Sequence, residues 1–222
     1  MPSPAIIFDL DGTLAETIGD LCAATNHALA SIGRPALANA EVRDFIGHGL
    51  RQLIGRGLEH TGGALSEAQV DELLERAFTF YAANLSHHSA PFAEVPEVLE
   101  GLRQAGHALA VCTNKPMRFT TPLLADLGLD GFFSVVMGGD SVAVRKPDPG
   151  HLLAVVEALG EVPTNVIMVG DSQTDVSTAR AAGIPVVAVS FGYSQVPAAE
   201  LGADALIDHF SELPAAIAGL GR

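Results

Sequence analysis

Hydrophobic positions along the chain follow two different periods, which divide it into two kinds of region. Residues 5–8 form a short apolar run with adjacent β-branched side chains, as is typical of a central strand covered on both faces. From residue 18 the apolar positions recur every three or four residues, which indicates amphipathic helices. After residue 91, short apolar runs alternate with helical segments. An α/β region interrupted by an all-helical one is therefore predicted.

The predicted elements place the interruption between residues 15 and 87. Its helices are expected at 18–32, 40–45, 50–58 and 66–85. The flanking parts, 1–14 and 88–222, alternate between strands and helices, which predicts one parallel sheet with right-handed crossovers. Further strands are expected at 109–112, 133–137, 166–169, 186–189 and 205–207. Helices are expected at 95–105, 116–127, 150–159 and 212–218, and one more follows the strand at 166–169 and ends at residue 182.

Composition narrows the class of protein. The chain has 222 residues, 48% of them hydrophobic, which is enough for a sizeable core. With a net charge of −14 and only 12 Lys and Arg, it has no basic run, so a nucleic-acid partner is not expected. Cys22 and Cys112 lie in apolar patterns and indicate buried thiols. Without a recognisable signal peptide or membrane span, the pattern predicts a cytoplasmic enzyme.

Polar residues gather where the predicted strands end. In a parallel sheet these ends share one edge, so the side chains are expected to converge on one site. Each residue also has a simpler interpretation, as a helix N-cap, a first-turn acid or a surface loop residue. The convergent set comprises Asp9, Asp11, Thr113, Asn114, Lys146, Asp171 and Asp175.

The order of these residues resembles the haloacid dehalogenase (HAD) superfamily of aspartate-based phosphohydrolases. The segment 9–14 (DLDGTL) matches its first motif, Thr113-Asn114 the second, Lys146 the third, and 170–172 (GDS) with Asp175 the fourth. The resemblance implies a Rossmann-like parallel-sheet core, the HAD fold, with an inserted C1-type helical cap. Within the superfamily, bacterial phosphoglycolate phosphatases are the most similar group, through the segments 113–116, 133–140, 146–147 and 191–193.

The resemblance also assigns roles. Asp9 would attack phosphorus and form an aspartyl-phosphate, and Asp11 would act as general acid and then base, protonated when substrate binds. Mg²⁺ would be held by Asp9, Asp171 and the carbonyl of Asp11, with Asp175 in a supporting position, because oxygen-only ligands suit this ion. Thr113, Asn114, Lys146 and Gly12 would bind the phosphate.

The expected substrate is a small phosphorylated metabolite, and the resemblance favours 2-phosphoglycolate. In the segment 47–51 (GHGLR), between two predicted helices of the inserted region, His48 and Arg51 are candidates for binding its carboxylate, although a plain interhelical turn is an equal interpretation. A phosphatase for pyrophosphate or a sugar phosphate, and a hexose-phosphate mutase, share the same core motifs. A dehalogenase has no need of Asp11, and a non-catalytic phosphate-binding module would not need all four motifs. The oligomeric state, monomer or homodimer, stays open.

Overall fold

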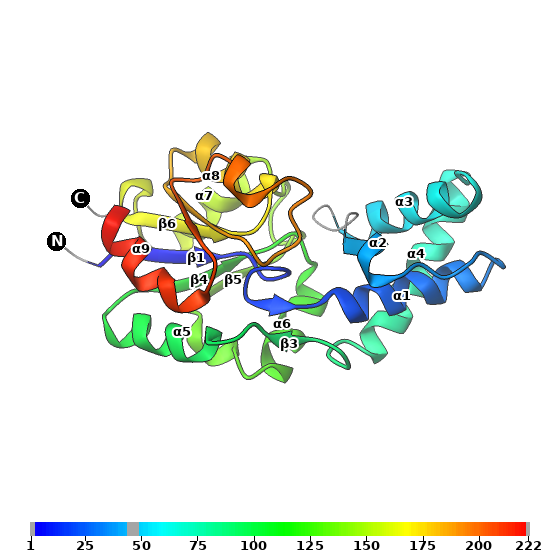
Figure 1. Cartoon of the computed structure of the whole chain (residues 1–222), viewed down its shortest axis with the longest axis horizontal. Helices are drawn as coiled ribbons and strands as arrows, with labels where there is room; N and C mark the ends of the chain where they lie inside the picture. Colours follow the sequence, from blue (N-terminus) through cyan, green and yellow to red (C-terminus); the bar gives the residue numbers. More distant parts are fainter. Residues whose placement is uncertain (1–2, 44–48, 221–222) are drawn as a thin grey trace. The chain divides into compact units, whose positions relative to one another are not determined.

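The computed structural model describes residues 3–43 and 49–220, which separate into two compact units. The sheet unit comprises residues 1–16 and 91–222, and the helical unit residues 17–90 (Figure 1). These divisions lie two or three residues from the boundaries expected from the sequence. Among the described residues, no helix combines the length and the apolar character needed to cross a bilayer.

A six-stranded parallel sheet organises the sheet unit, as predicted. Its strand order is β5-β4-β1-β6-β7-β8, so that β1 lies in the interior of the sheet, between β4 and β6. Every residue of β1 is buried, which explains the uninterrupted apolar run. The strands are β1 (Ala5–Phe8), β4 (Leu109–Cys112), β5 (Val135–Met137), β6 (Val166–Gly170), β7 (Val186–Val189) and β8 (Ala205–Ile207).

Helices cover both faces of this sheet (Figure 1). On one face Ile7 packs in a core cluster with Leu152 and Val155 of α7. On the other face the ring of Phe8 lies 6.1 Å from that of Phe210, just before α9. Successive β1 residues thus serve opposite faces, as the pleat requires. The helices of this unit are α5 (Val95–Gln104), α6 (Met117–Asp126), α7 (Pro149–Ala158), α8 (Gln173–Ala182) and α9 (Leu213–Leu220).

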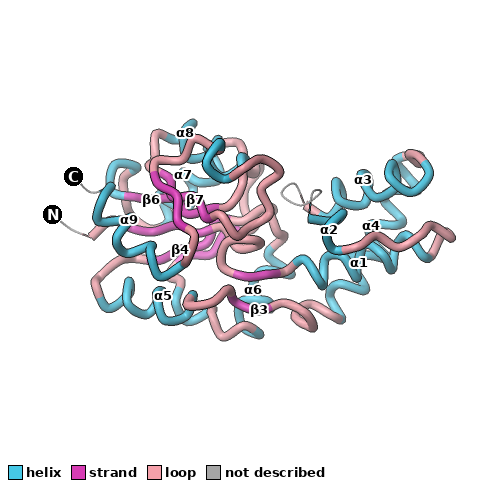
Figure 2. The backbone as a smooth tube through the Cα atoms, in the orientation of Figure 1, coloured by secondary structure: helices cyan, strands magenta, loops and turns pink. Residues whose placement is uncertain are grey.

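The helical unit packs its longest helices against each other. Figure 2 colours it almost entirely as helix and loop. Helix α4 ends at Ala83, two residues earlier than predicted, where the Asn84 side chain donates to the Phe80 carbonyl at 2.9 Å. The chain leaves and re-enters the sheet unit through two short paired strands, β2 (Ala15–Glu16) and β3 (Ala90–Pro91), which the sequence did not predict. The helices are α1 (Ile18–Ala30), α2 (Asn39–Arg43), α3 (Leu50–Gly62) and α4 (Glu67–Ala83).

Candidate active site

The turn after β1 presents Asp9 and Asp11 at the carboxyl edge of the sheet. The Asp9 amide continues the β1–β6 ladder by donating to the Val169 carbonyl at 2.9 Å. Gly12 follows with φ +86°, and a Cβ at this position would lie 2.5 Å from an Asp171 carboxylate oxygen. Glycine is therefore required here for two reasons: the left-handed backbone and the close approach of Asp171.

Lys146 contacts two carboxylates, Asp9 after β1 and Asp175 in the first turn of α8. Its ammonium lies 3.0 Å from Asp9 Oδ1 and 2.6 Å from Asp175 Oδ1, and its side chain is 1% exposed. Burial lowers the pKa of Lys146, but the carboxylates of Asp175 and Asp9 outweigh this and raise it above its ordinary value. Lys146 is therefore a fixed positive charge beside Asp9.

Asp171 comes from the turn between β6 and α8, and Asp175 from the first turn of α8. Asp171 accepts hydrogen bonds from the Tyr193 amide at 2.6 Å and from the Thr13 hydroxyl at 3.1 Å. Asp175 stands at the third position of α8 and closes a capping box with Ser172. Its simpler interpretation as a helix-start acid is thus correct, and its contact with Lys146 shows that it belongs to the cluster as well.

Three of these carboxylates suit a hard cation. Asp9, Asp171 and Asp175 each offer an oxygen within 4.8 Å of the others. Burial raises the pKa of Asp9 to about 6, with Lys146 opposing the rise, and burial also raises that of Asp171, helped by the charges of Asp175 and Asp9. Close, desolvated carboxylates gain from a divalent ion, and an all-oxygen donor set fits Mg²⁺.

Thr113 and Asn114 follow β4, on the side of β1 opposite to β6. The Thr113 amide donates to the Met137 carbonyl at 3.0 Å, and the Asn114 side chain donates to the Lys146 carbonyl at 3.0 Å. The segment after β4 is therefore tied to the loop that carries Lys146. The structure brings together in one unit all the residues of the four predicted motifs.

A comparison with protein families identifies the family of the chain. Residues 6–189 match the family model described as haloacid dehalogenase-like hydrolase. The chain belongs to this family.

Relatives and solved structures extend the match over nearly the whole chain. It is 42% identical over 215 residues to a phosphoglycolate phosphatase of Agrobacterium fabrum, covering 97% of this chain and 92% of that one. It is 43% identical over 211 residues to one of Caulobacter vibrioides, with coverages of 95% and 89%. The crystal structure of a predicted phosphoglycolate phosphatase from Haemophilus somnus, 32% identical, superposes with a TM-score of 0.91 over 96% of this chain and 97% of that one. The predicted family and fold are thereby confirmed.

One residue of the site was not predicted. The Lys115 ammonium donates to both carboxylate oxygens of Asp11, at 2.8 and 3.0 Å, and its side chain is 4% exposed. In the sequence Lys115 looks like the polar start of a helix, and its partner is 104 residues away. The signal that could have identified it is the lysine count, because Lys115 and Lys146 are the two lysines of the whole chain.

The candidate carboxylate-binding residues lie in the helical unit. Arg51, in the first turn of α3, pairs with Asp71 and, at 3.2 Å, with Glu67. Both partners belong to α4. The structure thus places Arg51 in an exposed ion-pair network, and His48 lies outside the described residues.

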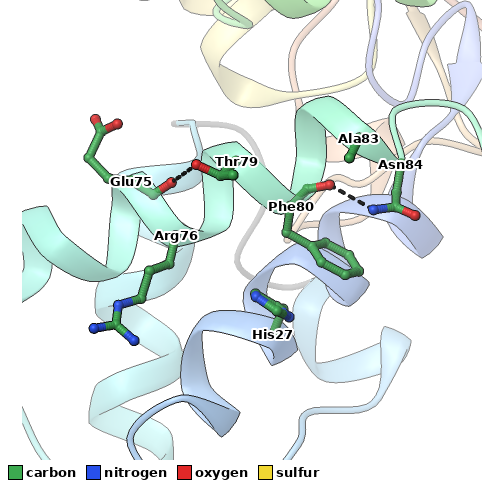
Figure 3. Close-up of a pocket in the computed structure, with 7 residues that line it drawn as sticks. All are labelled: His27, Glu75, Arg76, Thr79, Phe80, Ala83 and Asn84. Carbon is green, nitrogen blue, oxygen red and sulfur yellow. Dashed lines mark hydrogen bonds between the residues drawn. The ribbon is translucent and has the colours of Figure 1, made fainter.

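The helical unit also contains an open hollow on α1 and α4 (Figure 3). There His27 stacks on Phe80, with ring centroids 4.4 Å apart. Thr79 and Asn84, which also line it, donate hydrogen bonds to backbone carbonyls of α4, at 2.8 and 2.9 Å. The hollow therefore resembles an ordinary helix surface more than a reaction centre. The candidate catalytic residues are those of the sheet unit.

Proposed function

We propose that this protein is a Mg²⁺-dependent phosphomonoester hydrolase that forms an aspartyl-phosphate on Asp9, and that its substrate is 2-phosphoglycolate. The observation that carries the proposal is the placement of Asp9 between a buried ammonium, Lys146, and two further buried carboxylates. The relatives named phosphoglycolate phosphatase support the substrate. A cytoplasmic location is part of the same proposal.

Asp9 is the nucleophile in this scheme. It attacks phosphorus as the bond to the leaving oxygen breaks, and water later cleaves the resulting acyl phosphate. With a pKa of about 6, Asp9 is mostly ionised at neutral pH and needs no base to activate it. Lys146 offsets the negative charge of the phosphoryl oxygens. When bound, Mg²⁺ supplies further positive charge; Asp9, Asp171 and the Asp11 carbonyl would hold it, with Asp175 supporting.

Asp11 gives the leaving alkoxide its proton and then removes one from the attacking water. This role requires a protonated Asp11 when the ester bond breaks; in the structure the Asp11 carboxyl group contacts the ammonium of Lys115.

The remaining donors hold the phosphate. Thr113 would give its hydroxyl and Asn114 its backbone amide, with Gly12 beside them as a predicted phosphate contact whose own amide donates to the Ala15 carbonyl at 2.9 Å. The helical unit would act as a cap, inserted after the nucleophile motif and connected through β2 and β3. A cap excludes bulk water, so that the acyl phosphate meets only an oriented water molecule.

A substrate panel tests the proposal. Phosphate release is measured as kcat/KM for 2-phosphoglycolate, pyrophosphate, glucose 1-phosphate and p-nitrophenyl phosphate, and 2-phosphoglycolate is expected to give the highest value. A higher value for pyrophosphate or the sugar phosphate would overturn the substrate. Conversion of the sugar phosphate to an isomer without release of phosphate would indicate a mutase.

Metal dependence is tested in the same assay. EDTA should remove activity, Mg²⁺ should restore it, and Ca²⁺ should inhibit, because the larger ion accepts more ligands and can hold the Asp9 carboxylate through both oxygens. Full activity after exhaustive chelation, or with Ca²⁺ alone, would contradict the proposed metal.

A further inference from the structure

The two lysines of this chain are used in an unusual way. Ten of its twelve basic residues are arginines, and both lysines are buried beside the aspartates of the first motif. Lys146 has a place in the reaction because it faces Asp9. Lys115 has none so far, although burying its ammonium has a substantial desolvation cost.

Lys115 is held by a rigid support. Its carbonyl accepts hydrogen bonds from the Gly139 amide at 3.0 Å and from the Thr120 hydroxyl at 3.1 Å. A Cβ on Gly139 would lie 2.4 Å from the Asn114 carbonyl oxygen, so the turn after β5 packs against this segment without room for a side chain. The base of the lysine side chain is thus fixed before any ligand arrives, which lowers the entropic cost of binding.

The charge of the site leaves a role for this cation. Four carboxyl groups, those of Asp9, Asp11, Asp171 and Asp175, lie in this cluster with two ammonium groups, and Mg²⁺ would add two positive charges. A phosphate ester whose leaving group also bears a carboxylate brings a third negative charge. That charge needs a cation on the side of the leaving group, where Asp11 acts.

Lys115 stands at this position. In 2-phosphoglycolate a single methylene separates the leaving oxygen, which Asp11 must protonate, from the carboxylate carbon. An ammonium that already contacts Asp11 therefore lies near the place where this carboxylate would bind.

We propose that Lys115 binds the carboxylate of the leaving group and thereby selects small phosphorylated carboxylic acids over neutral phosphate esters. This inference rests on the proposed function and deepens it, and it locates carboxylate recognition in the sheet unit instead of at Arg51.

A matched pair of substrates tests the selectivity. 2-Hydroxyethyl phosphate keeps the ester and the chain length of 2-phosphoglycolate but replaces the carboxylate by a neutral group. For Lys115→Met, kcat/KM for 2-phosphoglycolate should fall roughly 10- to 100-fold more than kcat/KM for 2-hydroxyethyl phosphate, chiefly through KM, because a charged hydrogen bond is lost. Lys115→Arg should recover part of this difference. Equal losses on the two substrates would overturn the inference and leave Lys115 as a partner of Asp11 alone.

A binding measurement keeps the test independent of turnover and of the folding of the variants. After ¹⁵N-lysine labelling, this chain has two lysine ammonium signals, which Lys115→Arg assigns. In the Asp9→Asn protein with Mg²⁺, 2-phosphoglycolate should shift the Lys115 signal more than 2-hydroxyethyl phosphate does, while Lys146 serves as the internal reference for phosphate binding. Identical Lys115 shifts with both ligands would overturn the inference. Failure of the proposed function looks different, because wild-type protein would then give a higher kcat/KM for pyrophosphate or a sugar phosphate, or release no phosphate from 2-phosphoglycolate.

Discussion

The sheet unit and the helical unit use charged residues in opposite ways. In the sheet unit the Lys146–Asp175 pair is 1% and 0% exposed, and it shares its ammonium with Asp9. In the helical unit the Arg51–Glu67 pair is 47% and 94% exposed. Buried pairs rarely improve stability over apolar residues of the same size, whereas exposed pairs contribute little in either direction. The contrast indicates that the buried charges are kept for chemistry and the exposed ones for a solvated surface.

This contrast makes a graded prediction. Substitutions among the buried charges should impair activity far more than their effect on folding would explain. Substitutions among the exposed charges should leave both nearly unchanged. The variants below test the comparison, starting with the largest expected effect.

Asp9→Asn should lower the turnover rate by about 10³-fold or more, while the protein stays folded. The amide keeps the volume of the side chain but is a poor nucleophile and a weak metal ligand. Activity is measured with p-nitrophenyl phosphate, and folding by circular dichroism and Tm. Because Asn can deamidate to Asp, mass spectrometry of the assayed sample is the control. Activity within a few-fold of wild type would remove Asp9 from the role of nucleophile.

Asp11→Asn should slow hydrolysis of alkyl esters by about 10²–10⁴-fold, and of p-nitrophenyl phosphate by much less. Nitrophenolate leaves without a proton, whereas an alkoxide does not. The two rates are compared under single-turnover conditions so that breakdown of the acyl phosphate does not mask the first step. If both substrates lose the same factor, Asp11 is not the general acid.

Residues that follow strands were the most predictable part of this site. The range of β1 agrees with its prediction, and each predicted motif lies in the sheet unit, because the direction of a parallel strand fixes the edge at which its last residue lies. The pairing of side chains across that edge was not predictable. Whether Lys146 meets Asp9 or Asp175, or both, depends on loop geometry that leaves no periodic signal in the sequence.

The elements that sequence reasoning missed are short or distant in the chain. Strands β2 and β3 have two residues each, too few for an alternating pattern to be recognised. The contact of Lys115 with Asp11 joins residues 104 positions apart, and in the sequence Lys115 looks like the polar start of a helix. The strand predicted at 133–137 begins instead at Val135, after a short 3₁₀ helix over Asp130–Phe132 that the sequence did not predict.

His151 should make the stability of the protein depend on pH. It is fully buried in α7, and burial, with the charge of Lys146, lowers its pKa to about 4. The unfolded chain takes up a proton near pH 6.5 and the folded chain does not, so this residue makes the protein lose stability as the pH falls from about 6.5 to 4.

Between pH 7 and pH 4.5, the free energy of unfolding of His151→Leu should therefore fall by about 2 kcal/mol less than that of wild type. The measurement is urea unfolding of both proteins at the two pH values, with the difference between pH values taken for each protein so that the packing change cancels. His209→Leu, at an exposed position, is the matched control. The same loss in His151→Leu and wild type would show that this histidine is not buried in its neutral form.

Arg51→Ala should have the smallest effect, because its guanidinium is exposed and already paired with Asp71 and Glu67. We expect the free energy of unfolding to change by about 1 kcal/mol or less, and KM for 2-phosphoglycolate by less than about threefold. The same assay with p-nitrophenyl phosphate, which has no carboxylate, separates substrate recognition from any effect on the helical unit. A large rise in KM for 2-phosphoglycolate alone would restore the carboxylate role first predicted for Arg51 and would place substrate selection in both units. An equal rise for both substrates would instead indicate that the ion pair between α3 and α4 holds the helical unit in its working conformation.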